Sequence, residues 1–180
     1  MPDHSLLLHL DERFEGCDAL ETFRVAPGNR NYTSVDGALL SKDGKTLYRI
    51  AREGGAGTRT PETSRGFGVE RVIPEGVERI APGAFDGCAL LTSVALPASL
   101  QTIDAQAFRD SPALTQFQVA PENKNFRDVD GVLYSFDGKM LARYPEGKGD
   151  AFEVPNGVEI IGDGAFSGCK SLRTVALPLG

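Results

Sequence analysis

The sequence is poor in the residues on which most catalytic and metal sites depend. Its 180 residues include no tryptophan, two histidines and three cysteines, and no two cysteines form a C-x-x-C pair. A hydrolytic triad needs a histidine held rigidly beside a nucleophile, whereas His4 and His9 both lie in the first ten residues. Without a C-x-x-C pair a zinc site is poorly supported. The glycine run at 54–57 lacks the Lys-Ser/Thr of a phosphate loop. We therefore expect no enzyme activity, no cofactor and no bound metal.

Long apolar runs and an excess of basic residues are also missing. No stretch approaches the 18 apolar residues that a transmembrane helix requires. The run at 5–10 is too short for the apolar core of a signal peptide and follows Asp3 instead of a basic residue. A net charge of −6 gives no long-range attraction for nucleic acid or anionic lipid. We expect neither as a partner. Because the chain stops inside what looks like a further repeat, we expect it to be a piece of a longer protein.

Glycine (21) and proline (11) are abundant, which suits many short elements joined by tight turns. One frame occurs four times. Each copy begins with phenylalanine and has leucine at +6, phenylalanine or valine at +9, valine or leucine at +11 and a closing proline; position +3 is cysteine in three copies and Ser111 in the other. The four copies start at Phe14, Phe85, Phe108 and Phe166.

The frame predicts short strands stacked into a solenoid. Its last positions alternate apolar and polar residues, as in a strand with one buried face, and proline then ends the strand. A second short apolar run, such as Val77-x-x-Ile80, precedes the next phenylalanine. Phe85 and Phe108 are 23 residues apart, so one coil takes about two dozen residues. A coil cannot bury its apolar side alone, but stacked coils share a continuous core.

Two longer stretches repeat each other at an offset of 94 residues, as Val35-Asp36-Gly37 and Val129-Asp130-Gly131 show. In each, a later Asp-Gly pair lies between apolar runs, which predicts a β-hairpin with a type I′ turn at Asp43-Gly44 or Asp137-Gly138. We therefore expect one mainly β solenoid over 1–180. Its repeat cores lie near 14–27, 69–97, 98–121 and 155–178, and its hairpin inserts lie near 28–68 and 122–154. The first insert is longer by 13 residues, which we place in a mobile loop at 51–68.

These motifs resemble the BspA-like (treponemal-type) leucine-rich repeats. The resemblance rests on the frame at 84–97, AFDGCALLTSVALP, and on the insert segment from Asn125 through Tyr144-Pro145, and it covers roughly residues 14 to 178. It implies a curved solenoid from a bacterial surface or secreted protein, and some members of the family are implicated in adhesion. Three positions depart from the pattern: Arg13 replaces alanine, Leu10 lies one residue too close to Phe14, and Ser111-Pro112 replaces the cysteine turn.

Three features permit both a chemical and a structural interpretation. Cys17, Cys88 and Cys169 share one column and could form a disulfide or a metal site, but a small residue packed in a turn explains them better. The segment 128–131 faintly resembles a calcium loop but lacks the remaining ligands, which favours a turn. Asn31-Tyr32-Thr33 matches a glycosylation acceptor, whereas the corresponding segment of the second insert does not.

The strongest candidate site is the outward face of the strands. If the apolar residues of each strand point inward, the residues between them form a row on the surface, which is the usual ligand platform of repeat proteins. The hairpins and the 51–68 loop are rival recognition surfaces. The sequence thus favours a module that binds a protein or glycan, with a structural spacer as the alternative. The predicted ligand face consists of Thr22, Arg24, Ser93, Gln116, Gln118 and Thr174.

Overall fold

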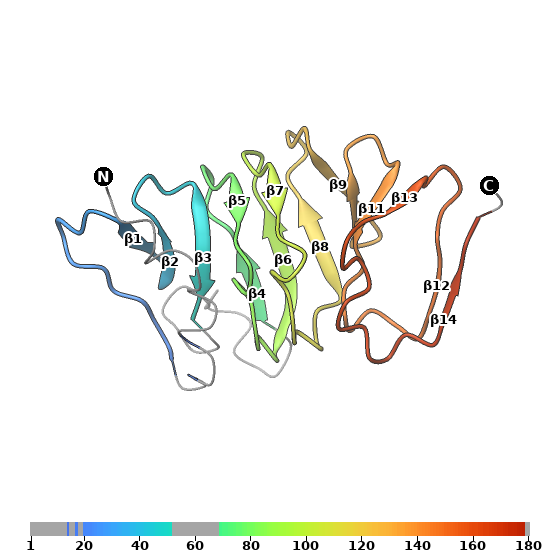
Figure 1. Cartoon of the computed structure of the whole chain (residues 1–180), viewed down its shortest axis with the longest axis horizontal. Helices are drawn as coiled ribbons and strands as arrows, with labels where there is room; N and C mark the ends of the chain where they lie inside the picture. Colours follow the sequence, from blue (N-terminus) through green and yellow to red (C-terminus); the bar gives the residue numbers. More distant parts are fainter. Residues whose placement is uncertain (1–13, 15–16, 18–19, 52–68, 179–180) are drawn as a thin grey trace.

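The structure is a computed structural model that describes residues 14, 17, 20–51 and 69–178. All regular elements in these ranges are β-strands joined by turns, and they stack along the long axis of the molecule from the N-terminal to the C-terminal end (Figure 1). The predicted mainly β solenoid is confirmed. The two histidines and the loop predicted at 51–68 lie outside the described residues, apart from Ala51. The strands are β1 (Tyr32–Val35), β2 (Ala38–Ser41), β3 (Thr46–Ile50), β4 (Val69–Val72), β5 (Arg79–Ile80), β6 (Leu91–Leu96), β7 (Thr102–Ile103), β8 (Gln116–Val119), β9 (Phe126–Val129), β10 (Val132–Ser135), β11 (Met140–Arg143), β12 (Ala151–Glu153), β13 (Ile160–Ile161) and β14 (Thr174–Ala176).

One side of the solenoid is a parallel three-stranded sheet in the order β4-β6-β8. Its strands come from the end of the repeat frame, where apolar and polar residues alternate. Val94 of β6 lies opposite Phe117 of β8, and both side chains are fully buried. Pro97 follows β6 directly and ends the strand, because proline has no N–H for the ladder.

The other side carries the short strands β5 and β7, which pair in parallel in a five-stranded sheet of order β1-β2-β3-β5-β7. The core lies between the two sides. Phe85 and Phe108, which begin consecutive copies of the frame, stack with their ring centroids 4.6 Å apart. Ile80 and Leu100 are likewise fully buried. Burying the same columns in successive coils makes one continuous cluster that extends from Ala38 to Leu133, whereas Tyr134, Leu141 and Tyr144 belong to a second cluster at the C-terminal end. The single continuous core that the sequence predicted is therefore divided in two at the second meander.

The two inserts are elongated coils and not additions outside the stack. Each forms a three-stranded antiparallel meander, β1-β2-β3 or β9-β10-β11. The last strand of each meander pairs in parallel with the next coil, β3 with β5 and β11 with β13. Ile50 and Tyr144 then donate backbone hydrogen bonds to Ala84 O and Ala165 O, and Phe85 makes the same bond to Ala107 O, each 2.8 Å long. Ile50 and Tyr144 therefore occupy the column of the repeat phenylalanine.

The hairpins predicted at Asp43-Gly44 and Asp137-Gly138 are present, but the predicted turn type is wrong there. A four-residue loop separates β2 from β3, and within that loop only Gly44 has a positive φ, of 74°. The two-residue type I′ turns are the earlier pairs, such as Asp130 and Gly131, with φ of 50° and 75°. The segment that faintly resembled a calcium loop is therefore the turn between β9 and β10.

Candidate ligand-binding face

The outer face of β4-β6-β8 carries two rows of residues that cross the sheet. The strand register places Glu70, Ser93 and Gln116 in one row. Val72, Ala95 and Gln118 form the second row, nearer the C-terminal ends of the strands. Gln116 and Gln118 are exposed, as the alternation in their strand predicts.

The six predicted residues do not form one continuous row. Thr22 and Arg24 precede the first meander, and Thr174 lies in β14, which pairs only with β12. Each meander brings a turn glycine against the segment before it, which is irregular at Thr22 and is β8 at Gln116: a Cβ on Gly37 would lie 2.9 Å from Thr22 Oγ1, and one on Gly131 2.6 Å from Gln116 Cβ. The Asp130-Gly131 turn thus ends the parallel sheet at β8.

Ser93 is also less accessible than its outward position suggested. Its side chain is on the outer face, where its Oγ accepts a hydrogen bond of 3.3 Å from Gln116 Nε2, yet the residue is only 5% exposed. Alternation predicts the direction of a side chain but not whether a longer neighbour covers it. Arg24, Gln116, Gln118 and Thr174 are exposed, and Thr22 is half-buried.

A groove of about 390 Å³ lies at the C-terminal ends of the three strands. It is lined by Val72, Ala95 and Gln118 of the second row together with the residues that follow them. Val72 is 72% exposed, the largest exposed fraction among the large hydrophobic residues of the described chain. The prediction omitted Val72 because β4 precedes a repeat and lacks the phenylalanine frame. Aligning Pro74 with Pro97 would have placed Val72 in the outward column of Ala95.

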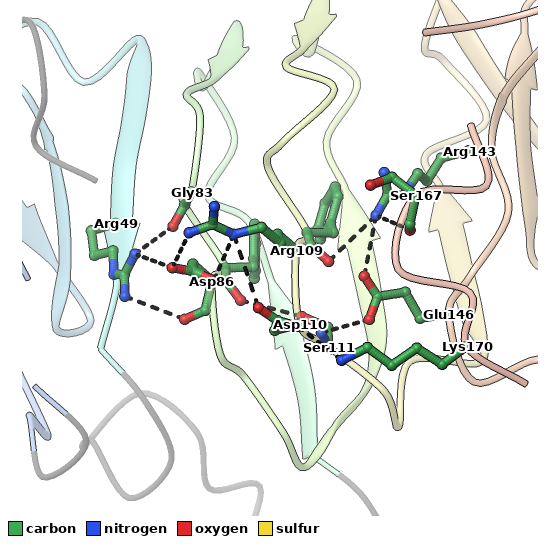
Figure 2. A network of polar contacts seen from close by, with 12 residues as sticks. Arg49, Gly83, Asp86, Arg109, Asp110, Ser111, Arg143, Glu146, Ser167 and Lys170 are labelled. Atoms are coloured by element: carbon green, nitrogen blue, oxygen red, sulfur yellow. Dashed lines mark hydrogen bonds and ion pairs between the residues drawn. The ribbon is translucent and has the colours of Figure 1, made fainter. Parts of the chain in front are cut away.

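Behind this face, the turns of successive coils are joined by buried charged groups (Figure 2). Arg143 Nη1 donates to Gly164 O at 2.7 Å and to Ala105 O at 3.0 Å, and its Nη2 lies 3.4 Å from Glu146 Oε1. Arg49 makes the equivalent bond to Gly83 O at 2.7 Å. Both arginines stand where the simple repeats have alanine, and both are buried. A guanidinium satisfies several turn carbonyls at once, so these residues hold adjacent coils in a fixed relation.

Glu146 also contacts the turn at Ser111, which stands where the other copies have cysteine. Glu146 Oε2 accepts a hydrogen bond of 2.8 Å from Ser111 N, and Ser111 Oγ donates to Phe85 O at 3.2 Å. Burial raises the pKa of Glu146, and the Ser111 hydrogen bond and the charge of Arg143 oppose that rise. Asp86 connects a second pair of coils through Arg109, whose Nη2 lies 3.0 Å from Asp86 Oδ2.

The cysteine column shows the features of turn packing. None of the three cysteines is in a disulfide; Cys88 is buried, Cys169 is half-buried and Cys17 is exposed. Burial raises the pKa of Cys169 to about 11, so its reactive thiolate is scarce at neutral pH. Asp128, in the segment compared above with a calcium loop, uses Oδ1 to accept a hydrogen bond from Val119 N at 2.8 Å. In the described part of the chain, no three acidic, histidine or cysteine residues gather as metal ligands.

The fold and the repeated frame define a leucine-rich-repeat solenoid. A family model described as the BspA type leucine-rich repeat region matches six copies over residues 69–131 and 146–180, more than half of the chain. The chain belongs to this family, as the sequence motifs predicted. No curated protein matches it. No helix among the described residues has the length and apolar character needed to cross a membrane.

Three solved structures are similar to the chain. A leucine-rich repeat protein from Eubacterium ventriosum is 23% identical, with a TM-score of 0.53 over 59% of this chain and 29% of its own. A leucine-rich cell surface protein from Faecalibacterium prausnitzii is 29% identical, with a TM-score of 0.46 over 61% and 35%. The pneumococcal vaccine antigen PcpA is 18% identical, with a TM-score of 0.36 over 84% and 54%. The chain thus spans from under a third to about half of the length of these proteins.

Proposed function

We propose that the chain is a protein-binding module, and that its ligand surface is the outer face of β4-β6-β8 with the groove beside Val72. The observation that carries this proposal is the exposure of Val72 on a rigid parallel sheet. An aliphatic side chain that is 72% exposed gains from burial against a partner. Ala95 and Gln118 continue its row across the sheet and line the groove with it, which leaves room for a partner side chain.

The scaffold supports recognition because it is held together behind this face. Val94 and Phe117, the inward neighbours of the face residues, are fully buried in the core. Such a face meets a partner without first having to become ordered, which lowers the entropic cost of binding. Gln116 and Gln118 supply donors and acceptors at the edge of the apolar groove, the usual arrangement of a small interface.

Membership of the BspA-type family supports a bacterial surface or secreted location and a role in adhesion to a protein partner. The repeat fold of this family is generally not enzymatic, and we propose a binding role and not a catalytic one. The rival function is a spacer that displays other domains. A spacer needs no exposed valine in a groove, so Val72 favours the binding role.

The test is capture of host extracellular and cell-surface proteins on immobilised chain, followed by affinity measurement with each captured protein. We expect Val72→Asp to lower affinity at least tenfold, because it places a charge in an apolar contact. Gln116→Ala and Gln118→Ala should give smaller losses, and Arg24→Ala should have no effect, because Arg24 belongs to a different coil.

Val35→Asp is the matched control, because Val35 is an exposed valine at the end of β1 and not on β4-β6-β8. Equal binding by wild type, Val72→Asp and the glutamine variants would remove this face from the proposal. Failure to capture any protein would favour the spacer.

A further inference from the structure

A second and larger cavity lies on the other side of the solenoid, where the second meander separates the coils. Its volume is about 490 Å³. β7 forms one wall, and strands β9, β10 and β11 supply apolar residues to the others. The apolar lining consists of Ile103, Phe126, Leu133, Met140 and Ala142. This cavity shares no residue with the groove beside Val72.

The cavity exists because β11 does not continue the sheet of β7. In the preceding coils each short strand pairs with the next, β3 with β5 and β5 with β7. β11 pairs instead with β10 and β13, so β7 is the terminal strand of its sheet and has no pairing partner on the cavity side among the described residues. An open strand edge beside a cavity is the geometry that accepts an added strand from another chain.

Two carboxylates line this cavity, Asp104 just after β7 and Asp163 just after β13. Asp104 Oδ1 accepts a hydrogen bond of 2.9 Å from Gln106 N, and neither carboxylate forms an ion pair within the described chain. The nearby cations are already engaged: Lys139 pairs with Glu159 at 2.7 Å, and Arg143 pairs with Glu146. The cavity therefore retains an excess of negative charge.

Arg143 fixes the two acidic turns relative to each other. Its Nη1 bonds both Ala105 O, next to Asp104, and Gly164 O, next to Asp163. Arg143 itself lines the cavity, and its buried Nε has no hydrogen-bond partner. An unpaired buried donor is costly, so Arg143 is held at the wall of the cavity at some cost to stability.

We propose that this cavity binds an extended segment of a partner protein that carries a lysine or arginine. The backbone of the segment pairs with the free edge of β7. The aliphatic part of the basic side chain packs on Ile103, Met140 and Ala142, and its charge lies between Asp104 and Asp163. Long basic side chains combine an apolar stem with a charged end, which matches this division of the lining. This site is separate from the proposed face on β4-β6-β8, and each can fail without the other.

The test uses extended acetylated pentapeptides with threonine and valine around a central lysine or arginine, and the same peptides with norleucine or glutamate at the centre. We expect the basic peptides to shift the amide resonances of residues 101–105 and 140–143 in a titration followed by nuclear magnetic resonance. Replacing the central lysine by norleucine, or changing Asp104→Asn and Asp163→Asn together, should lower affinity roughly tenfold.

Glu122→Gln with Glu153→Gln is the matched control, because it removes the same charge from exposed carboxylates outside the cavity and should leave affinity unchanged. Ala142→Leu fills the cavity at constant charge and should also weaken binding. The proposal is overturned if norleucine or glutamate peptides bind as tightly as the basic ones. It is equally overturned if Ala142→Leu binds like wild type, if no basic peptide binds at millimolar concentration, or if the shifts fall only on β4-β6-β8.

Discussion

The two meander coils have closely related sequences but different surroundings, and comparing them separates what the local sequence determines from what stacking adds. Asn29 and Asn123 occupy equivalent positions before β1 and β9. Each uses Oδ1 to accept hydrogen bonds from the backbone N–H groups two and three residues later, at 2.9 Å in the first coil and 2.8 Å in the second. The turn is therefore a local property of the sequence.

The burial of these asparagines is not local. Asn123 is 1% exposed, and its Nδ2 donates to Pro97 O at 2.8 Å and Leu100 O at 3.0 Å, both in the preceding coil. Asn29 is exposed. The same residue is thus a surface turn former in one copy and a buried connection between coils in the other.

The arginines of the two meanders differ in the same way. Arg49 donates to two turn carbonyls, and its acidic neighbour Asp86 also pairs with Arg109. Arg143 donates to four carbonyls in two turns and pairs with Glu146, which is 3% exposed. Arg143 therefore joins three coils.

The largest expected effect comes from removing these guanidinium groups. Arg143→Met removes four hydrogen bonds to turn carbonyls and the cationic partner of the buried Glu146 carboxylate, so we expect a loss of about 3–5 kcal/mol in unfolding free energy. Arg49→Met leaves fewer groups unpaired and keeps Asp86 paired with Arg109, so we expect about 1–3 kcal/mol. Urea unfolding followed by circular dichroism measures both.

Arg109→Met is the control, because this half-exposed arginine makes an ion pair of a kind that contributes about 1 kcal/mol or less. Equal losses for Arg49→Met and Arg143→Met would show that the carbonyl bonds shared by both arginines, and not the additional partners of Arg143, account for their contribution.

A smaller difference is expected between the asparagines. Asn123→Ala removes the two turn bonds to Oδ1 and the two bonds from Nδ2, and although Leu100 O keeps its bond from Asn125 Nδ2, the loss should cost about 2–3 kcal/mol. Asn29→Ala loses only the exposed turn contacts and should cost about 0.5–1 kcal/mol. Thermal unfolding of both variants tests this order, and similar changes in Tm would mean that the local turn, not the contact with the preceding coil, dominates.

The sequence predicted the core residues well because every coil must bury the same apolar columns. Leu91 and Phe117 are buried as their columns indicate, and the offset of 94 residues located both meanders. The sequence period predicts burial correctly where a core residue packs against the equivalent residue of the next coil.

The site was harder to predict, because its features arise where the repeat is broken. Arg49 and Arg143 stand in an alanine column, and their partners are backbone carbonyls, which no side-chain pattern reveals. Ser93 points outward as predicted but is covered by Gln116. The cavity beside β7 depends on the pairing of β11 with β10 and β13 instead of with β7, and the sequence pattern alone does not predict which strands pair.

The smallest expected effect is a pH dependence that belongs to the second meander coil. Burial raises the pKa of Glu146, so the folded chain holds this proton more tightly than the unfolded chain does. The stability contributed by this group is fully present below the ordinary glutamate pKa, about 4.3, and is lost as the pH rises through the raised value. Asp43 and Asp137 act in the opposite direction, because hydrogen bonds from Ser41 and Ser135 lower the pKa of each.

Comparing wild type with Glu146→Gln isolates this contribution, since both proteins contain Asp43 and Asp137. Unfolding free energies measured at intervals from pH 4 to 7 should show wild type losing stability relative to the variant as the pH rises. The change should be small, because Arg143 and Ser111 N stabilise the charged carboxylate and oppose the effect of burial. A difference that stays constant across this range would mean that these partners fully offset the burial of Glu146. The pKa of Glu146 would then be the same in the folded and the unfolded chain, and this carboxylate would contribute no pH dependence to stability.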